Sequence, residues 1–515
     1  MEAGRRPLIT SLTRAAATEI ASRVEVGWGF SSEQVGTLHS HCFRSLNNPT
    51  LISKQEHIDD WNTYVKEANP TWVLSLGAFV SKSADADGSR AAVGDPVYRD
   101  YCMLRSRMTA SEFWPMNVRA FGEKFREWRS LSSLMDFSDL IESAMKNQVP
   151  APFNPDTIFV DEAQDHDRLE LSLLRQWSRG VDRIVVCGDP DQNLYSWRGA
   201  EPEAFYATEI PDSHYIVLSQ SYRVPRKVHA IAQRLIGRVK ERRPVVYHPR
   251  DVEGECRTSH LRLRADYEVA AEAEKIAAGG RSVMILASCE YMLSGLIQFL
   301  RQAGIPFHNP YATNRGSFNP LGDRNGVSSP QRLLAFLRAD ERYCEDARRW
   351  TWSEFAAWVD PLDVAGLLRR GAKKRVEDLG RQRAEQVVDG GTLRELLDPA
   401  GGAECLAASR ENPLGWYRAR LNKSRAAAFD FPLAVCQRRG VRALTEKPKI
   451  ILGTVHSVKG GEAEVVMVFP DLSPQGAETF GGDPDAIWRL FYVAATRAKE
   501  ELILCSSSSG SSVGW

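Results

Sequence analysis

Two adjacent acidic residues, Asp161 and Glu162, follow directly after the apolar run at 157–160. A short apolar run that ends in acids is typical of a buried parallel strand, and ligands bind beyond the carboxyl ends of such strands. One carboxylate of the pair can hold Mg²⁺ while the other orients an attacking water, which is the chemistry of nucleotide hydrolysis. A bare Asp-Glu pair is more often a solvated acidic loop. A functional interpretation of this pair therefore needs evidence from other parts of the chain.

A second block of polar and aromatic residues, at 188–200, follows another apolar run at 183–187. It reads Gly-Asp-Pro-Asp-Gln-Asn-Leu-Tyr-Ser-Trp-Arg-Gly-Ala. A lone tryptophan usually packs in a core, but Trp197 lies between Ser196 and Arg198, which favours a binding role.

With this block in place, the sequence resembles the UvrD/Rep-like superfamily 1 DNA helicases along nearly the whole chain. The family's motifs Ia and Ib, its short "DF-DL" element and its motifs II to VI resemble, in chain order, residues 8–23, 36–42, 135–141, 161–165, 188–200, 218–223, 454–462 and 491–499. Any one block could arise by chance. Their occurrence together in the family's order is not a plausible accident.

The resemblance implies catalytic roles for Asp161, Glu162, Gln192, Arg223 and Arg497. Asp161 would support Mg²⁺, Glu162 would activate water, and Gln192 would sense the γ-phosphate and couple it to DNA. The two arginines would act as arginine fingers, since a planar and permanently charged fork suits a transferring phosphoryl group. An arginine on a helix is usually solvated, but Arg497 follows an apolar Tyr-Val-Ala-Ala stretch, which favours the functional interpretation.

The resemblance also implies ATP and Mg²⁺ as cofactors, and contacts with single-stranded DNA. Tyr222 would stack on the adenine, Glu462 would reach the ribose, and Gly460 would belong to the same nucleotide-binding segment. The implied DNA contacts are Thr13, Arg14, His39, Tyr195, Trp197, Arg198, His456 and Lys459. Within this set Thr13 and Arg14 would touch the phosphate backbone, whereas His39, His456 and Lys459 are, taken singly, more often structural.

One part of the expected machinery is missing from the sequence. A phosphate-binding loop follows the pattern Gly-x-x-x-x-Gly-Lys-Ser/Thr, and no Gly-Lys dipeptide occurs among the 515 residues. In the family this loop lies upstream of motif Ia. Three explanations stay open: a true start further upstream, a loop supplied by another polypeptide, or a hydrolysis-deficient binder. The joint presence of Glu162, Gln192, Arg223 and Arg497 favours the first.

These residues require a scaffold of parallel strands alternating with helices. Apolar runs predict strands at 7–10, 157–160, 183–187, 282–287, 449–453, 465–469 and 501–505, with helices at 15–24 and 293–304. The predicted fold class is α/β, and the resemblance implies two RecA-like parallel-sheet domains with helical insertions, lacking the first strand and the phosphate-binding loop. The predicted divisions are domain 1A at 1–214 with insertion 1B at about 45–130, domain 2A at 215–312 plus 446–508, a reduced insertion 2B at 313–445, and a disordered tail at 509–515.

Composition sets broad limits on the class of protein. Lys+Arg and Asp+Glu are both 66, which argues against a histone-like coat of positive charge. Nine cysteines never form Cys-x-x-Cys, which indicates reduced thiols in a cytosol-like compartment. We therefore expect a cytoplasmic protein, in a bacterium or a phage-infected host, with no membrane partner. The basic runs at 238–243 and 369–375 are interpreted either as phosphate-binding segments or as solvated helix faces.

The resulting hypothesis is an ATP-dependent DNA helicase or translocase with 3′→5′ polarity implied by the resemblance. Two domains would close around ATP and reopen after hydrolysis, moving the protein along single-stranded DNA. The expected partners are single-stranded DNA, junctions of single- and double-stranded DNA, and replication or repair proteins. The alternative is a single-stranded DNA-binding protein that keeps Tyr195 and Trp197 but does not hydrolyse ATP. The choice between replication, repair and recombination stays open, as does RNA in place of DNA.

Overall fold

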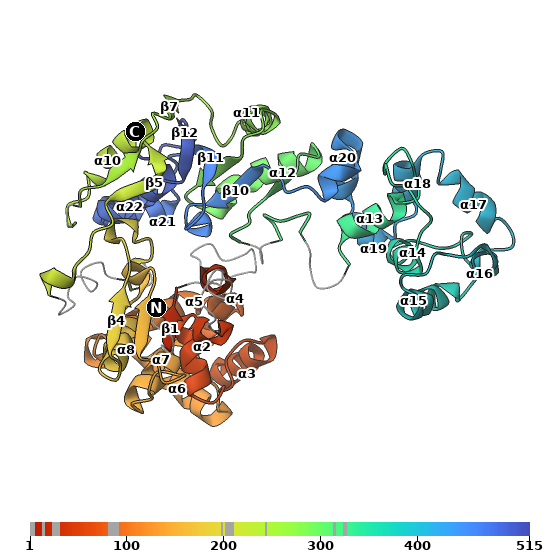
Figure 1. Ribbon diagram of the computed structural model, residues 1–515. Helices are drawn as coiled ribbons and strands as arrows, with labels where there is room; N and C mark the ends of the chain where they lie inside the picture. The colour runs from red at the N-terminus through yellow and green to blue at the C-terminus, as the bar shows by residue number, and fades with distance from the viewer. Residues whose placement is uncertain are drawn as a thin grey trace. The chain divides into compact units, whose positions relative to one another are not determined.

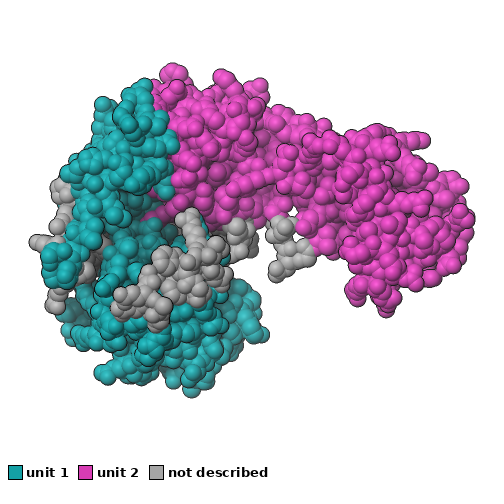
Figure 2. Space-filling view, in the orientation of Figure 1, with its two compact units in different colours: residues 1–253, 473–496 teal, residues 254–472, 497–515 magenta. Residues whose placement is uncertain are grey.

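The computed structural model describes residues 6–12, 16–22, 31–80, 92–196, 199–200, 211–242, 245–312, 316–322 and 327–515. The chain forms two compact units, drawn in different colours in Figure 2. Unit 1 comprises 1–253 and 473–496, and unit 2 comprises 254–472 and 497–515. The chain therefore passes from one unit to the other three times.

The sheet of unit 1 has four parallel strands in the order β2-β1-β3-β4. Of these, β1 and β4 are labelled in Figure 1. Their bounds are β1 Pro7–Thr10, β2 Val35–Gly36, β3 Thr157–Val160 and β4 Arg183–Val186. The last residues of three strands are in register, because Thr10 pairs with Val160 and Val160 with Val186. The segments after these strands consequently start at one edge of the sheet. The strands predicted at 7–10, 157–160 and 183–187 are confirmed.

Three amphipathic helices cover this sheet, and residues 16–22 are also helical, as predicted. The helices are α2 Leu38–Ser45, α7 Phe137–Lys146 and α8 Arg168–Ser178. Each begins with a side-chain cap, from Thr37, Asp136 and Asp167 respectively. Leu38, Leu140 and Leu173 share one core with Leu8 and Ile158 of the strands. Burial of these apolar side chains fixes the helices to the sheet.

A helical insertion of unit 1 has a separate, aromatic core, and its helices lie close to the expected range of 45–130. Its helices are α3 Gln55–Lys66, α4 Gly77–Val80, α5 Asp95–Ser106 and α6 Met116–Ser132. Trp61 is fully buried at its centre and makes edge-on contacts with Phe121, Phe125 and Trp128.

The remainder of unit 1 pairs two short strands and packs three helices. The elements are β5 Gln220–Pro225, α10 Arg226–Ile236, β6 His248–Arg250, α21 Pro474–Gly482 and α22 Pro484–Ala495. Helix α10 packs against α22, and α22 also contacts the turn at 190–192. These contacts group residues up to 253 and residues 473–496 with the N-terminal sheet, whereas the predicted domain 2A began at 215 and included 473–496. The predicted domain boundaries stay a prediction.

Unit 2 is built on six parallel strands in the order β7-β12-β11-β8-β10-β9. The strands are β7 Glu255–Thr258, β8 Val283–Ala287, β9 Phe307–His308, β10 Ile450–Thr454, β11 Ala463–Val468 and β12 Ala498–Leu504. Helices α11 Asp266–Ala278 and α12 Ser294–Gln302 pack with this sheet in one core. The predicted strands at 282–287, 449–453, 465–469 and 501–505 and the predicted helix at 293–304 are confirmed.

Between β9 and β10 the chain is helical, as expected for the second insertion. Its helices are α13 Ser329–Leu337, α14 Trp352–Val359, α15 Ala372–Gln382, α16 Gly390–Leu396, α17 Gly402–Ala408, α18 Pro413–Ala419, α19 Lys423–Ala426 and α20 Asp430–Arg439. Trp352, Phe355, Trp358 and Tyr417 are fully buried in a core that is continuous with that of the sheet.

The C-terminal tail differs from its predicted disorder. Val513 is buried and its amide donates to the Pro470 carbonyl at 3.1 Å. The Trp515 indole N–H donates to the Cys505 carbonyl at 2.7 Å. The Ser-rich composition of this segment suggested disorder, but Val513 and Trp515 supply the apolar anchors that order a tail.

The fold class expected from the sequence is confirmed: both units are α/β, with parallel sheets and helical insertions. No helix in the described part of the chain is both long enough and apolar enough to cross a membrane.

Candidate functional site

The carboxylates Asp161 and Glu162 lie where β3 ends, as predicted. The Asp161 amide donates to the Thr10 carbonyl at 2.8 Å, and the Ser11 hydroxyl donates to Asp161 Oδ2 at 3.3 Å. Both bonds come from the end of β1, which holds Asp161 where the neighbouring strand β3 ends. Burial, and next the charge of Glu162, raise the pKa of the Asp161 carboxyl above its usual value. A cation bound here would offset both effects.

Glu162 has a left-handed backbone, with φ 53° and ψ 41°. This conformation costs a residue with a Cβ roughly 1–2 kcal/mol. Such strain is concentrated at functional sites. The Gln164 side-chain amide donates to Glu162 Oε2, so the carboxylate is held by a residue two positions later.

Gln164 joins the ends of β3 and β4, a role that the sequence did not reveal. Its Oε1 accepts the Asp189 amide at 3.0 Å, and its backbone carbonyl accepts the Asn193 side chain at 2.5 Å. A Cβ at Gly188 would come within 2.5 Å of Gln164 Oε1, so only glycine fits there without a shift. A buried glutamine opposite a glycine is visible only once the two strand ends are adjacent.

Gln192 is connected to the same network. Its Nε2 donates to Asp189 Oδ2 at 2.7 Å, and Asp189 N is bonded to Gln164. Burial raises the pKa of the Asp189 carboxyl despite the opposing hydrogen bond from Gln192. The structure therefore brings Glu162 and Gln192 into one chain of hydrogen bonds through Gln164 and Asp189.

Asp191, beside Gln192, pairs with an arginine distant in sequence. Arg242 Nε donates to Asp191 Oδ1 at 3.0 Å and Nη2 to Oδ2 at 2.5 Å, and both side chains are largely shielded from water. The bond to Asp191 is the main reason that the pKa of Arg242 is raised. Two parallel hydrogen bonds of this kind fix the orientation of the guanidinium relative to the carboxylate as well as their distance. Neither residue was among the predicted site residues.

The segment that carries Arg242 is fixed to the start of α22. The amides of Lys240 and Glu241 donate to the Asp485 carboxylate at 3.0–3.1 Å. Arg238 lies over the Trp488 ring at 4.3 Å. In the basic run at 238–243, Arg238 and Arg242 are thus engaged within the protein. Arg242 is therefore not a solvated residue, whereas Arg238 remains exposed over the Trp488 ring, and phosphate binding by this run stays a prediction.

Tyr222 and Arg223 lie on β5 in unit 1. The Tyr222 ring is 86% exposed, so its face is accessible for stacking. The Ser221 hydroxyl accepts the amides of Arg223 at 3.2 Å and Val224 at 3.0 Å, which sets the backbone on both sides of Arg223. Arg223 is half-buried.

The residues predicted to contact DNA have different environments. Tyr195 is buried, so its ring does not offer an open stacking face in this structure. His39 lies 3.4 Å from the Glu170 carboxylate and packs edge-on to Phe137. Thr13, Arg14, Trp197 and Arg198 lie outside the described residues.

In unit 2, the turn after β10 carries several further predicted residues. His456 and Lys459 are half-buried there, and Gly460 has a φ of 82°, which favours glycine. Glu462 forms an ion pair with Lys499 at 3.1 Å, and its amide donates to the Tyr311 hydroxyl at 3.2 Å.

Arg497 is held against this same turn. It is only 2% exposed, and Nη1 donates to the Gly461 carbonyl at 3.3 Å. The Ala463 amide donates to the Arg497 carbonyl at 3.1 Å. The solvated-helix interpretation of Arg497 is therefore wrong, because the residue follows α22 and enters β12 inside the fold.

Within the described ranges, no three His, Cys, Asp or Glu side chains gather as a metal site. Mg²⁺ that is bound with a nucleotide commonly uses one or two carboxylates together with phosphate oxygens. Asp161 could supply such a ligand.

Two models of one helicase family match the chain. Residues 4–210 match the UvrD/REP helicase N-terminal domain, and residues 449–505 match the UvrD-like helicase C-terminal domain. Together these segments make up about half of the chain. Both sets of candidate residues, at the ends of β3 and β4 and after β10, lie in the matched segments.

Comparison with individual proteins leads to the same family. The chain is 26% identical over 255 residues to the ATP-dependent DNA helicase PcrA of Staphylococcus epidermidis, covering 46% of this chain and 34% of that protein. It is 25% identical over 258 residues to PcrA of Bacillus subtilis and of Staphylococcus aureus, with the same coverage. The match thus spans about a third of the length of these relatives.

Proposed function

Because the chain belongs to the UvrD/REP-like helicase family, we propose that it provides the ATP-hydrolysis and strand-tracking parts of a DNA helicase. The single observation that supports this proposal best is the hydrogen-bonded chain Glu162–Gln164–Asp189–Gln192. It links a carboxylate suited to orienting water with an amide suited to sensing a phosphate. The 3′→5′ polarity remains part of the proposal by family resemblance.

The acidic pair suits a nucleotide-bound Mg²⁺. Asp161 would hold the cation and Glu162 would accept a proton from the attacking water. The raised pKa of Asp161, caused by burial and by Glu162, supports a cation here, since a divalent charge would stabilise both carboxylates. When bound, Mg²⁺ would neutralise charge that develops on the phosphate oxygens.

Tyr222, Arg223 and Arg497 would complete the nucleotide chemistry. The exposed Tyr222 ring offers a face for adenine, and Arg223 follows it on β5. Arg497 would stabilise charge on the transferring phosphate, with Gly460 and Glu462 contributing from the neighbouring turn. Its bond to Gly461 supports a fixed orientation.

For the strand-tracking part, we propose Thr13, Arg14, His39, Trp197, Arg198, His456 and Lys459 as DNA contacts. Tyr195 was also predicted to contact DNA; because its ring is buried, we propose that it supports the backbone next to this set and does not stack on a base. The partners would be single-stranded DNA and its junctions with duplex, in replication or repair.

A second candidate is single-strand binding without hydrolysis. No Gly-Lys dipeptide, which a phosphate-binding loop requires, occurs among the 515 residues, so hydrolysis by these residues is what the experiment must measure. The two candidates share their DNA contacts and differ only in turnover.

The test is DNA-stimulated ATP hydrolysis. We would measure phosphate release with and without a dT oligonucleotide, for this chain and for a version extended through any in-frame upstream sequence. Glu162→Gln keeps the shape and the hydrogen-bonding capacity of the side chain but removes the base, and should lower turnover by at least about 100-fold. Glu500→Gln, in the strand β12, is the matched control and should leave turnover unchanged.

If neither version hydrolyses ATP while Trp197→Ala weakens oligonucleotide binding, the non-hydrolysing candidate holds. If hydrolysis occurs but Glu162→Gln retains it, the role of the acidic pair is wrong.

A further inference from the structure

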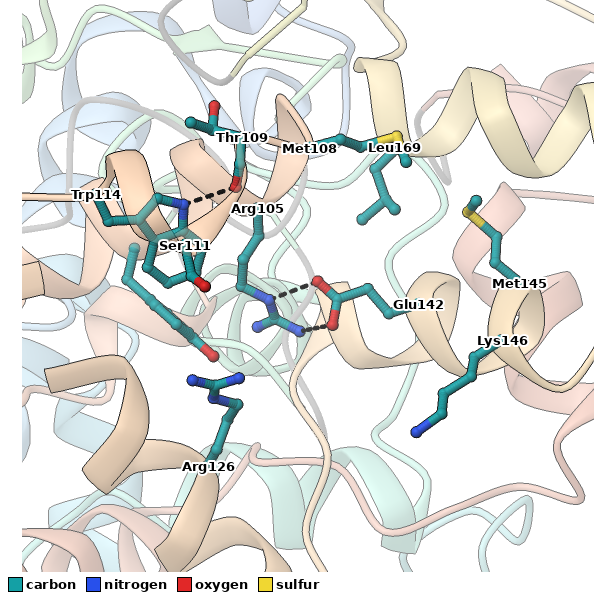
Figure 3. A pocket seen from close by; sticks show the side chains of 11 residues that line it. Arg105, Met108, Thr109, Ser111, Trp114, Arg126, Glu142, Met145, Lys146 and Leu169 are labelled. Carbon is teal, nitrogen blue, oxygen red and sulfur yellow. Dashed lines mark hydrogen bonds and ion pairs between the residues drawn. The ribbon is translucent and has the colours of Figure 1, made fainter. Parts of the chain in front are cut away.

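A cavity of about 490 Å³ lies in unit 1 between the helical insertion and the helices α7 and α8 (Figure 3). Residues from α5 to α6 line one side of it, and residues of α7 and α8 line the other. None of the predicted catalytic, nucleotide or DNA residues lines it. Its volume lies within the range of sites that hold a small ligand or one or two side chains of a partner.

The charged residues of the cavity are unequally paired. Arg105 Nε and Nη2 bond both oxygens of Glu142 at 2.7 and 2.8 Å, so the carboxylate that lines the cavity has a cation, which it shares with Asp136 and Asp139. For Arg126 only a bond from Nε to the Gly122 carbonyl is found, and for Lys146 no acidic partner is found within the described residues. In Figure 3 the Arg126 guanidinium points toward the Arg105–Glu142 pair, and Lys146 extends from α7 on the far side of Glu142. Two cations therefore remain available to an anionic ligand.

The walls of the cavity are apolar and partly accessible. Trp114, Met108, Met145 and Leu169 line it, and the Trp114 indole N–H is already bonded to the Thr109 carbonyl at 2.7 Å. Met108 is 46% exposed and the neighbouring Phe113 is 74% exposed. Tryptophan, arginine and methionine are enriched in interfaces between proteins. Methionine side chains are flexible and can adapt to different partner side chains.

We propose that this cavity docks an acidic peptide segment of a partner protein, with one aromatic or large aliphatic side chain as its anchor. The anchor would lie against Trp114 and the methionines, and carboxylates on either side would pair with Arg126 and Lys146. The inference does not depend on ATP hydrolysis, because no residue of the cavity belongs to that machinery.

The ion cluster beneath the cavity favours a peptide over a nucleic acid strand. Arg105 and Arg129 bond three carboxylates, those of Asp136, Asp139 and Glu142, so this cluster carries one excess negative charge. With Arg126 and Lys146 the net charge near the cavity is only plus one. A polyanionic backbone needs a row of uncompensated cations, whereas one or two carboxylates need only a pair.

The test is calorimetric titration of the whole chain with the unlabelled peptide acetyl-Glu-Asp-Phe-Glu-Asp-amide. The isosteric neutral peptide acetyl-Gln-Asn-Phe-Gln-Asn-amide reports the contribution of charge, and a 15-nucleotide dT strand reports nucleic acid binding. We expect the acidic peptide to bind at least about tenfold more tightly than the neutral one. Combining Arg126→Glu with Lys146→Glu should weaken the acidic peptide by at least about tenfold.

Matched variants separate a local effect from a general one. Lys124→Glu reverses one charge on α6, as Arg126→Glu alone does, but two residues away on the helix. It is the control for Arg126→Glu alone and should leave peptide affinity within about twofold. Met108→Asn removes an apolar wall at a position with φ 55°, which asparagine tolerates, and should weaken the peptide. Leu131→Asn, at an apolar side chain that is 72% exposed and lies outside the cavity, should not.

Three results would overturn the proposal: no peptide binding, equal affinity for the acidic and neutral peptides, or unchanged peptide affinity in the doubly reversed variant. A dT strand that loses affinity in that variant, while the peptide does not bind, would assign the cavity to nucleic acid instead. Far-ultraviolet circular dichroism of each variant shows that the fold is retained.

Discussion

Arg242 and Arg226 each bond an aspartate, but the two pairs differ in exposure. The side chains of Arg242 and Asp191 are 15% and 10% exposed, whereas those of Arg226 and Asp251 are 54% and 89% exposed. Removing Arg242 leaves a shielded carboxylate without its cation, which costs about 2–3 kcal/mol, while an exposed pair is worth about 0–1 kcal/mol. We predict that Arg242→Met lowers the free energy of unfolding in urea by the larger amount and Arg226→Met by the smaller. Equal losses would contradict the argument from burial.

The burial of His41 leads to a prediction about how the stability of the fold depends on pH. It is fully buried, and its Nε2 contacts the Ile9 carbonyl at 3.1 Å. Burial, opposed by that hydrogen bond and reinforced by Arg44, lowers the pKa of His41 to about 4. The unfolded chain therefore takes up a proton near pH 6.5 that the folded chain takes up only near pH 4. The stability that neutral His41 contributes to the folded state is therefore fully present above pH 6.5 and is lost as the pH falls toward 4.

Between pH 7 and pH 5 we expect His41 to account for about 2 kcal/mol of lost stability. His41→Gln keeps a donor for the Ile9 carbonyl but cannot take up a proton. Urea unfolding at the two pH values should show a smaller pH difference for the variant than for the original chain. An unchanged difference would mean that His41 is not the titrating group.

The sequence identified single residues better than the bonds between them. Asp161 and Glu162 were noticed as an acidic pair after an apolar strand, and their roles and that of Gln192 were implied by the resemblance to helicase motifs. Gln164 was passed over although it lies in the same block, since its role depends on the spacing between the ends of β3 and β4. Asp191 and Arg242 are 51 residues apart, and nothing in their spacing reveals the pair. Such long-range contacts follow from the fold and are not encoded in local patterns.

Helices and strands, like single residues, were predicted where their local sequence pattern is strong and missed where it is weak. The buried strands of both sheets were predicted because parallel strands covered on both faces are continuous apolar runs. The strands β2 and β9, each of two residues, carry too little pattern to predict. β7 was also missed, because Glu255, Arg257 and Thr258 are polar or charged and it lies at the sheet edge beside β12.

The aromatic core of the first helical insertion allows a prediction about the stability of these helices. Trp61 is fully buried among Phe121, Phe125 and Trp128, and its indole N–H donates to the Trp72 carbonyl at 2.9 Å. Trp61→Ala should cost about 3–5 kcal/mol, from lost burial and the cavity left behind. Phe113→Ala, at an exposed ring of the same insertion, should cost less than about 0.5 kcal/mol. Chemical denaturation that shows similar losses would mean that this cluster is not a core of its own.

At the scale of the whole molecule, the order of strands in unit 2 constrains how the chain can be divided. The strand β12 comes last in sequence but lies between β7 and β11 in the sheet. A fragment of residues 254–472 therefore lacks a central strand and leaves β7 with no partner. Exposed strand edges promote association between chains. We predict that this fragment elutes as an aggregate in size-exclusion chromatography.

Restoring β12 should reverse that behaviour. A second fragment joins residues 254–472 to 497–515 through a flexible Gly/Ser linker of about 20 residues in place of 473–496. It regains β12 and also the tail, whose Val513 amide donates to Pro470 and whose Trp515 bonds Cys505. We expect it to elute as a folded monomer with a cooperative thermal transition. If 254–472 alone were monomeric and cooperative, the C-terminal strand would be dispensable, and the chain's last return to unit 2 would serve another purpose than completing its sheet.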